Sequence, residues 1–115
     1  MRRDEVLLGD MLSAAKRIER YIAGMDRTSF LGDEKTQAAV ARDIEIMGEA
    51  ASRVSVGLKS AHPEVPWHDL TDLRNFYIHA YHAVMYEKVW YTATGLVRRV
   101  RAAVSAILPP ADETE

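Results

Sequence analysis

Residues 40–58 read VARDIEIMGEAASRVSVGL, and this stretch decides the fold. Its apolar residues recur at alternating intervals of four and three, which is the spacing of one face of an amphipathic α-helix. The series runs through Val40, Ile44, Met47, Ala51, Val54 and Leu58. Asp33 precedes the pattern as an N-cap candidate, and Glu34 places negative charge at the positive end of the helix dipole. The sequence therefore predicts a helix over residues 34–57.

Three further segments are predicted to be helical, two of them from a periodic apolar stripe. One stripe predicts a helix over 5–24, and a second predicts a helix from Tyr86 to just before Pro109. Between them, Asp69 is a candidate N-cap for a shorter helix over 69–82. The stripes are Leu7, Met11, Ala14, Ile18, Tyr21 and Met25, and then Val89, Ala93, Leu96, Val100, Ala103 and Ile107.

No stretch alternates polar and apolar residues between hairpin turns, so no strand is predicted. Four helices joined mostly by short loops indicate an all-α, antiparallel four-helix bundle. The 115 residues suffice for one domain, which we place at residues 1–108, with 109–115 as a flexible acidic tail.

The amino-acid composition excludes several kinds of site and several classes of protein. The chain has no cysteine, which excludes disulfides, thiolate metal sites and cysteine nucleophiles. Residues 1–111 carry 15 basic and 14 acidic groups, which nearly cancel. The protein therefore lacks the large positive charge of proteins that coat nucleic acid. No apolar run approaches the roughly 18 residues of a membrane span, and no secretory signal is evident. We expect a cytoplasmic protein that does not bind membranes.

The four histidines fall within 21 residues, and residues 73–81 read LRNFYIHAY. On a helix, Asn75 and His79 lie about 40° apart and share a face, whereas Arg74 and His79 lie about 140° apart and flank a groove. An imidazole can take a proton from a ribose 2'-hydroxyl, and the fork of Arg74 can stabilise the charge of a pentacoordinate phosphate. Such a reaction needs no metal and leaves a 2',3'-cyclic phosphate. One histidine serves poorly as both acid and base, so we expect a two-fold dimer through the helix 69–82.

Other interpretations of the same residues stay open. An arginine and a histidine on an amphipathic helix are usually a surface ion pair and a satisfied histidine. Alternatively, His79 and His82 could bind a metal with Asp69, Asp72 or His68.

Neighbouring motifs are also ambiguous. Glu49 and Arg53 fit a surface ion pair, and residues 98–101, RRVR, fit either a solvated face or an RNA contact. Pro66 and Trp67 are expected to anchor a loop. The helically spaced aromatic residues fit either the core or a base-stacking surface. They are Tyr77, Tyr81, Tyr86 and Trp90.

Four motifs in order carry a family resemblance. They are MGEAA at 47–51, PEVPW at 63–67, RNFYIHAY at 74–81 and VW at 89–90. This series resembles the HEPN superfamily, specifically the HepT-like ribonuclease toxins. The resemblance implies a dimeric, metal-independent endoribonuclease without a cofactor, in which Arg74 and His79 are catalytic and Asn75 supports them.

The resemblance also implies a partner. HepT-like toxins are paired with an MNT-type nucleotidyltransferase antitoxin, which transfers AMP from ATP to the motif tyrosine, here Tyr81. An adenylate beside Arg74 would occupy the phosphate site and repel RNA. A non-catalytic helical subunit that presents a nucleotide or another substrate to a nucleotidyltransferase is the alternative function.

Overall fold

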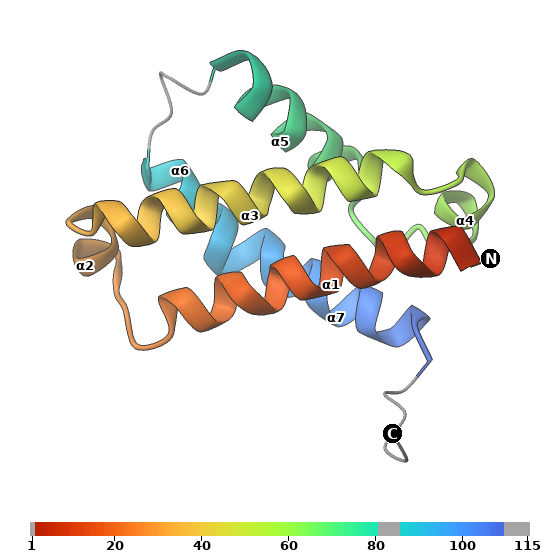
Figure 1. Cartoon of the computed structure of the whole chain (residues 1–115), viewed down its shortest axis with the longest axis horizontal. Coiled ribbons are helices and arrows are strands. Elements are labelled where there is room, and N and C mark those ends of the chain that lie inside the picture. Colours follow the sequence, from red (N-terminus) through yellow and green to blue (C-terminus); the bar gives the residue numbers. More distant parts are fainter. Residues whose placement is uncertain (1, 81–85, 110–115) are drawn as a thin grey trace.

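The computed structural model describes residues 2–80 and 86–109, and all of its regular elements are helical (Figure 1). In chain order they are α1 (Arg2–Ile22), α2 (Arg27–Leu31), α3 (Glu34–Arg53), α4 (Val56–Ala61), α5 (Trp67–Ala80), α6 (Tyr86–Tyr91), the π-helical turn η2 (Thr92–Leu96) and α7 (Val97–Ile107). The predicted all-α class is confirmed. No helix within the described ranges is long and apolar enough to cross a membrane.

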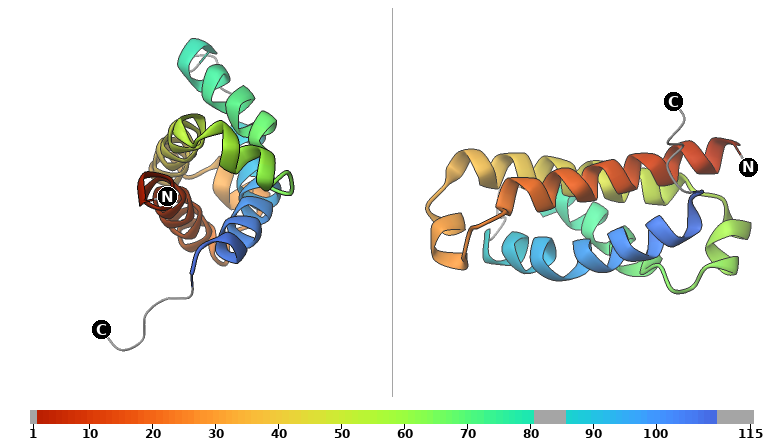
Figure 2. Two further views of the ribbon diagram at one scale, coloured as in Figure 1. Left: turned by 90° about the vertical axis from the view of Figure 1, so that its right-hand side faces the viewer. Right: turned by 90° about the horizontal axis from the view of Figure 1, so that it is seen from below.

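Three long rods form the centre of the molecule. α1 runs antiparallel to α3, and the continuous rod α6–η2–α7 packs against α1 (Figures 1 and 2). α5 packs against α3 and then projects away from the other rods, as the end-on view shows (Figure 2). The fourth helix of the bundle is therefore splayed outward from the other three.

The core follows the predicted stripes. Fully buried side chains come from all three rods and include Met11, Ile18, Val40, Ile44, Met47, Val89, Val97 and Val100. Tyr21 departs from its predicted core position: 37% of it is exposed, and Ile22 is buried instead. The last buried position of α1 is thus residue 22 instead of the predicted 21, and Met25, the predicted last member of the stripe, lies beyond the end of the helix and is partly buried.

A separate short helix, α4, follows α3 and extends beyond the end of the predicted helix at residue 57. α3 ends at Arg53, and Ser55 then caps α4 by accepting a hydrogen bond from the backbone N–H of Leu58 at 3.2 Å. Asp4 in α1 holds this corner, since it accepts hydrogen bonds from the Ser55 hydroxyl at 2.6 Å and the Ser55 backbone N–H at 3.0 Å. The predicted helix over 34–57 is therefore divided at Val54.

The caps at the other helix starts explain the remaining differences. Asp33 caps α3 through the N–H of Thr36 at 3.1 Å, as predicted. α2 was not predicted, although Asp26 and Ser29 form a reciprocal capping box there. α5 begins at Trp67, and the N–H of Leu70 donates to the carbonyl of Pro66 at 3.1 Å, so Asp69 lies in the first turn and is not the cap.

The π-helical turn shifts the buried stripe of the last rod. The expected positions 96, 103 and 107 are only partly buried, whereas Val97 and Val104 are fully buried. A π-helical turn contains more residues than an α-helical turn. Buried positions in and after this turn therefore fall about one residue later in the sequence than a regular α-helix predicts. Sequence periodicity alone does not show this insertion.

Candidate active site

α5 approaches α3 closely at Gly48. A Cβ atom at this position would lie 3.1 Å from Cβ of Arg74 and 3.2 Å from the carbonyl oxygen of Leu70. The absence of a side chain at Gly48 thus permits the close approach of the two helices, and the crossing point brings Arg74 directly opposite α3. At the start of α5, the indole N–H of Trp67 donates to the carbonyl of His62 at 2.9 Å, which anchors the preceding loop as predicted.

Glu49, the residue after Gly48, holds the guanidinium of Arg74. Nε of Arg74 donates to Oε1 of Glu49 at 2.6 Å, and Nη1 lies 3.4 Å from Oδ1 of Asn75, at the long limit for a hydrogen bond. The side chains of Arg74 and Glu49 are 33% and 51% exposed. The terminal nitrogens of Arg74 thus keep donors for an anionic ligand.

The expected surface pair between Glu49 and Arg53 is wrong. Both residues are on α3 and one turn apart, but the carboxylate of Glu49 binds across to α5. Within the described part of the chain, Arg53 makes no ion pair. Sequence reasoning missed the contact between Glu49 and Arg74, although Gly48 beside an acidic residue was a signal of close helix approach.

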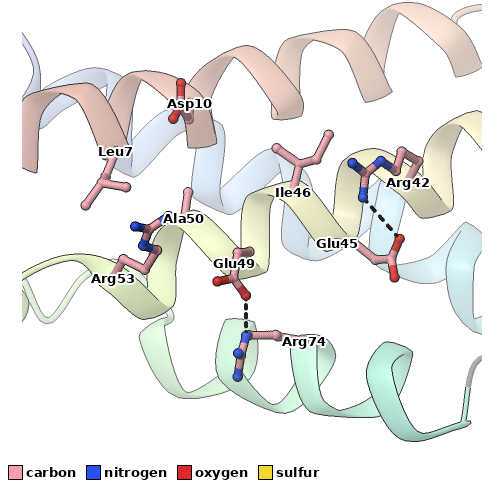
Figure 3. Close-up of a pocket in the computed structure, with 9 residues that line it drawn as sticks. All are labelled: Leu7, Asp10, Arg42, Glu45, Ile46, Glu49, Ala50, Arg53 and Arg74. Carbon is pink, nitrogen blue, oxygen red and sulfur yellow. Dashed lines mark hydrogen bonds and ion pairs between the residues drawn. The ribbon is translucent and has the colours of Figure 1, made fainter.

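A cleft adjoins this contact, and we name it the α3 cleft (Figure 3). It has a volume of about 330 Å³ and lies over α3, with α1 on one side and Arg74 on the other. Its lining residues are Leu7, Asp10, Arg42, Glu45, Ile46, Glu49, Ala50, Arg53 and Arg74. Arg74 therefore lies at the edge of a cleft with an apolar floor and charged walls.

The other predicted site residues are only partly described. The backbone of α5 is helical through His79, so positions 75 and 79 are one turn apart on the same helix. The side chain of His79, and both Tyr81 and His82, lie outside the described residues. The structure thus brings Arg74 and Asn75 together with Glu49 and does not test the assignment of His79 or Tyr81.

Two of the four histidines have local carboxylate partners. Nδ1 of His62 lies 3.1 Å from Glu64, and Nε2 of His68 lies 3.3 Å from Asp72. The Glu64 backbone N–H and the contact with His62 lower the pKa of the Glu64 carboxyl. Among the residues that the structure describes, no three histidine or carboxylate side chains are grouped to hold a metal ion. The metal site based on His79 and His82 falls outside those residues.

Comparison with known proteins identifies the family. The HepT-like family, described as "Ribonuclease HepT-like", matches residues 11–107. "Probable ribonuclease HepT" of Thermococcus cleftensis is 39% identical over 85 residues, which cover 74% of this chain and 77% of that protein. "Putative RNase MJ0127" of Methanocaldococcus jannaschii is 37% identical over 83 residues, which cover 72% and 69%. No solved structure matches the chain significantly. The chain belongs to the HepT-like ribonuclease family.

Proposed function

We propose that this protein is an endoribonuclease that cleaves RNA without a metal ion, with Arg74, Asn75 and His79 at its catalytic centre. The observation that carries the proposal is the contact between Glu49 and Arg74. It fixes a partly exposed guanidinium at the edge of a cleft while leaving its terminal N–H groups available. Membership of a ribonuclease family supports RNA as the substrate.

The proposed reaction is an internal transesterification. The 2'-oxygen loses its proton to an imidazole and attacks the adjacent phosphorus, and the bond from phosphorus to the 5'-oxygen breaks. The departing 5'-oxygen receives a proton, so the products are a 2',3'-cyclic phosphate and a 5'-hydroxyl. Arg74 would donate to the non-bridging oxygens, where negative charge develops in the transition state.

His79 is proposed as the acid–base group. Its position one helical turn after Asn75 supports this role, since an amide at i can orient an imidazole at i+4. One imidazole does not easily serve as base and acid in a single step. We therefore propose that a second copy of the chain supplies the second histidine, and the outward splay of α5 is compatible with such a two-fold dimer.

The direct test uses the purified chain and a single-stranded RNA in the presence of EDTA. The wild type is expected to yield 2',3'-cyclic phosphate ends, and both Arg74→Ala and His79→Ala are expected to abolish cleavage while retaining helical circular dichroism. Arg20→Ala is the control, because Arg20 is exposed on α1 and stacks over Tyr21 outside the α3 cleft. Tight ATP binding without cleavage would instead indicate a non-catalytic subunit of a nucleotidyltransferase complex.

We further propose that the enzyme is the toxin of a toxin–antitoxin pair, with an MNT-type nucleotidyltransferase as antitoxin. Tyr81 would accept AMP from ATP through its hydroxyl, with pyrophosphate released. Tyr81 follows Arg74 by seven residues in the sequence, so the modified residue and the phosphate-binding group belong to the same short motif. The anionic adenylate would compete with RNA for Arg74.

This proposal is tested by co-expression with the nucleotidyltransferase, followed by mass spectrometry. Peptides that contain Tyr81 should carry the mass of AMP, and Tyr81→Phe should remove the addition and leave RNA cleavage active in the presence of the partner. An unmodified Tyr81 in a fully inhibited complex would contradict the assignment.

A further inference from the structure

The α3 cleft contains one arginine whose charge is not neutralised by an ion pair. Arg42 lies 3.8 Å from Glu45, and Arg74 is bound by Glu49, but Arg53 has no acidic partner within the described ranges. Arg53 is exposed on the last turn of α3 and lines the same cleft as Arg74 (Figure 3). A second guanidinium is therefore available beside the proposed catalytic one.

The opposite wall of the cleft presents a carboxylate. Asp10 on α1 is exposed and, in the part of the chain that the structure describes, forms neither a hydrogen bond nor an ion pair. Leu7 and Ala50, which are 8% and 6% exposed, lie between Asp10 and Arg53, and the partly buried Ile46 continues this apolar floor toward Arg42 (Figure 3). The cleft thus offers an anion-binding group, an apolar floor and a hydrogen-bond acceptor in one place.

The dimensions of the cleft favour a small ligand. Its volume of about 330 Å³ is at the lower end of the range for ligand-binding clefts. This size suits one nucleotide of a single strand. Bases that are splayed out of a single strand are usually recognised through their hydrogen-bonding edges and their faces.

We infer that the α3 cleft is a subsite for the nucleotide that adjoins the scissile phosphate. This inference rests on the proposed function, because it places the scissile phosphate at Arg74. Arg53 binds the phosphate of the flanking nucleotide, and the apolar floor receives its base. Asp10 accepts a hydrogen bond from the exocyclic amino group of cytosine, adenine or guanine, which uracil lacks. The cleft therefore gives the enzyme a preference against uracil at one flanking position.

The role of Arg53 is tested by binding of an RNA oligonucleotide that carries a 2'-deoxy sugar at the cleavage site and so cannot react. Arg53→Ala is expected to weaken binding about ten-fold and to reduce the slope of log K against log salt by about one, as for the loss of one phosphate contact. Arg20→Ala removes the same charge from an exposed position on α1 and should weaken binding less. Equal effects of the two variants would overturn the inference.

The role of Asp10 is tested by base preference. Wild-type kcat/KM is expected to be roughly ten-fold higher for oligonucleotides with cytosine than with uracil at the flanking position. In Asp10→Asn the amide can also donate to the carbonyl of uracil, so the preference should fall toward one. An unchanged ratio would show that Asp10 does not contact the base.

The catalytic function and the nucleotide subsite can be disproved independently. If Arg74→Ala abolishes cleavage while Arg53→Ala and Asp10→Asn behave as wild type, the catalytic assignment stands and the subsite is wrong. If the wild type never cleaves RNA but Arg53→Ala still weakens binding selectively, the cleft binds RNA and the proposed catalytic function is wrong.

Discussion

Glu49 on α3 accepts a 2.6 Å hydrogen bond from Nε of Arg74 on α5, and this contact joins residues that are 25 positions apart in the chain. Partly exposed ion pairs of this kind contribute only about 0.2–1 kcal/mol to folding stability. The main physical effect of the contact is therefore on orientation. It restricts rotation of the guanidinium and leaves the Nη side for a phosphate, so we infer that Glu49 is a positioning residue.

Replacing Glu49 should reduce turnover more than stability. We expect Glu49→Ala to lower kcat by about 10- to 100-fold, because a misplacement of around 1 Å at a reacting group costs that much, while the thermal midpoint changes little. Glu49→Asp, which keeps the carboxylate, should restore part of the rate. Measurements of kcat and KM with a short RNA, together with thermal unfolding, separate the two effects.

The matched control for this variant is Glu19→Ala. Glu19 on α1 binds Nε of Arg101 on α7 at 2.9 Å, an interhelical pair of the same chemistry away from α5. Glu19→Ala should lose about as much stability as Glu49→Ala and retain the wild-type kcat. If both variants retained the wild-type kcat, Glu49 would have no positioning role.

Lysine should not replace Arg74. A lysine ammonium is a point charge without a planar fork, so it cannot keep the geometry in which one side binds Glu49 and the other binds phosphate. We expect Arg74→Lys to lose at least about 100-fold in kcat, comparable to the loss of a transition-state hydrogen-bond donor. Arg101→Lys is the control on α7. A rate for Arg74→Lys within a few-fold of wild type would show that charge alone suffices.

Gly48 sets the distance between α3 and α5, and its substitution should be costly. A methyl group there would meet Arg74 and the Leu70 carbonyl at 3.1 and 3.2 Å, and we expect Gly48→Ala to destabilise the fold by about 1–3 kcal/mol. It should also lower the cleavage rate, since α5 must move away from Glu49. Urea denaturation and a cleavage assay measure both quantities.

Gly9→Ala is the corresponding control. Gly9 lies within α1, and an added Cβ would meet no atom within 4 Å. Alanine has the higher helix propensity, so this variant should be more stable by up to about 1 kcal/mol. If Gly48→Ala were stabilised to the same extent, the helix separation would not depend on glycine.

The helices could be predicted from the sequence wherever burial follows a regular period. Ile44 and Met47 fall on the predicted face of α3 and are buried, and the cap at Asp33 lies where a short polar residue precedes the pattern. The short helices α2 and α4 could not be predicted in this way. Each has only one or two turns and depends on capping contacts, and the corner at Ser55 is fixed by Asp4, 51 residues away.

For the candidate site, the sequence motif predicted which side chains lie on one helix. It did not predict which residues of other helices bind them. Arg74 and Asn75 were identified from a single stretch, but the pairing of Arg74 with Glu49 depends on how closely α3 and α5 approach each other. The same limit applies to the α3 cleft, since Asp10 and Arg53 come from different helices. Tertiary contacts of this kind have no periodic signal in one sequence.

The corner between α1 and α4 should make stability depend on pH. The hydroxyl of Ser55, and then its backbone N–H, hold the pKa of the Asp4 carboxyl below its ordinary value of 3.8. A pKa that is lower in the folded than in the unfolded state adds stability above the unfolded value, and this stability is lost as the pH falls through the folded pKa. Asp4→Asn should therefore lower the urea midpoint clearly at pH 7, and the gap from wild type should narrow below about pH 3.8.

The difference in stability between wild type and Asp4→Asn reports the contribution of Asp4 alone. Other carboxylates also lose stabilising interactions as the pH falls. Backbone N–H groups also lower the pKa values of Asp26 and Asp33, so the wild type loses stability in acid for several reasons. Glu5→Gln is the control, because Glu5 is exposed beside Asp4 in the first turn of α1. A gap between Asp4→Asn and wild type that stayed constant from pH 7 to pH 3 would show that the carboxylate stabilises the corner without its charge.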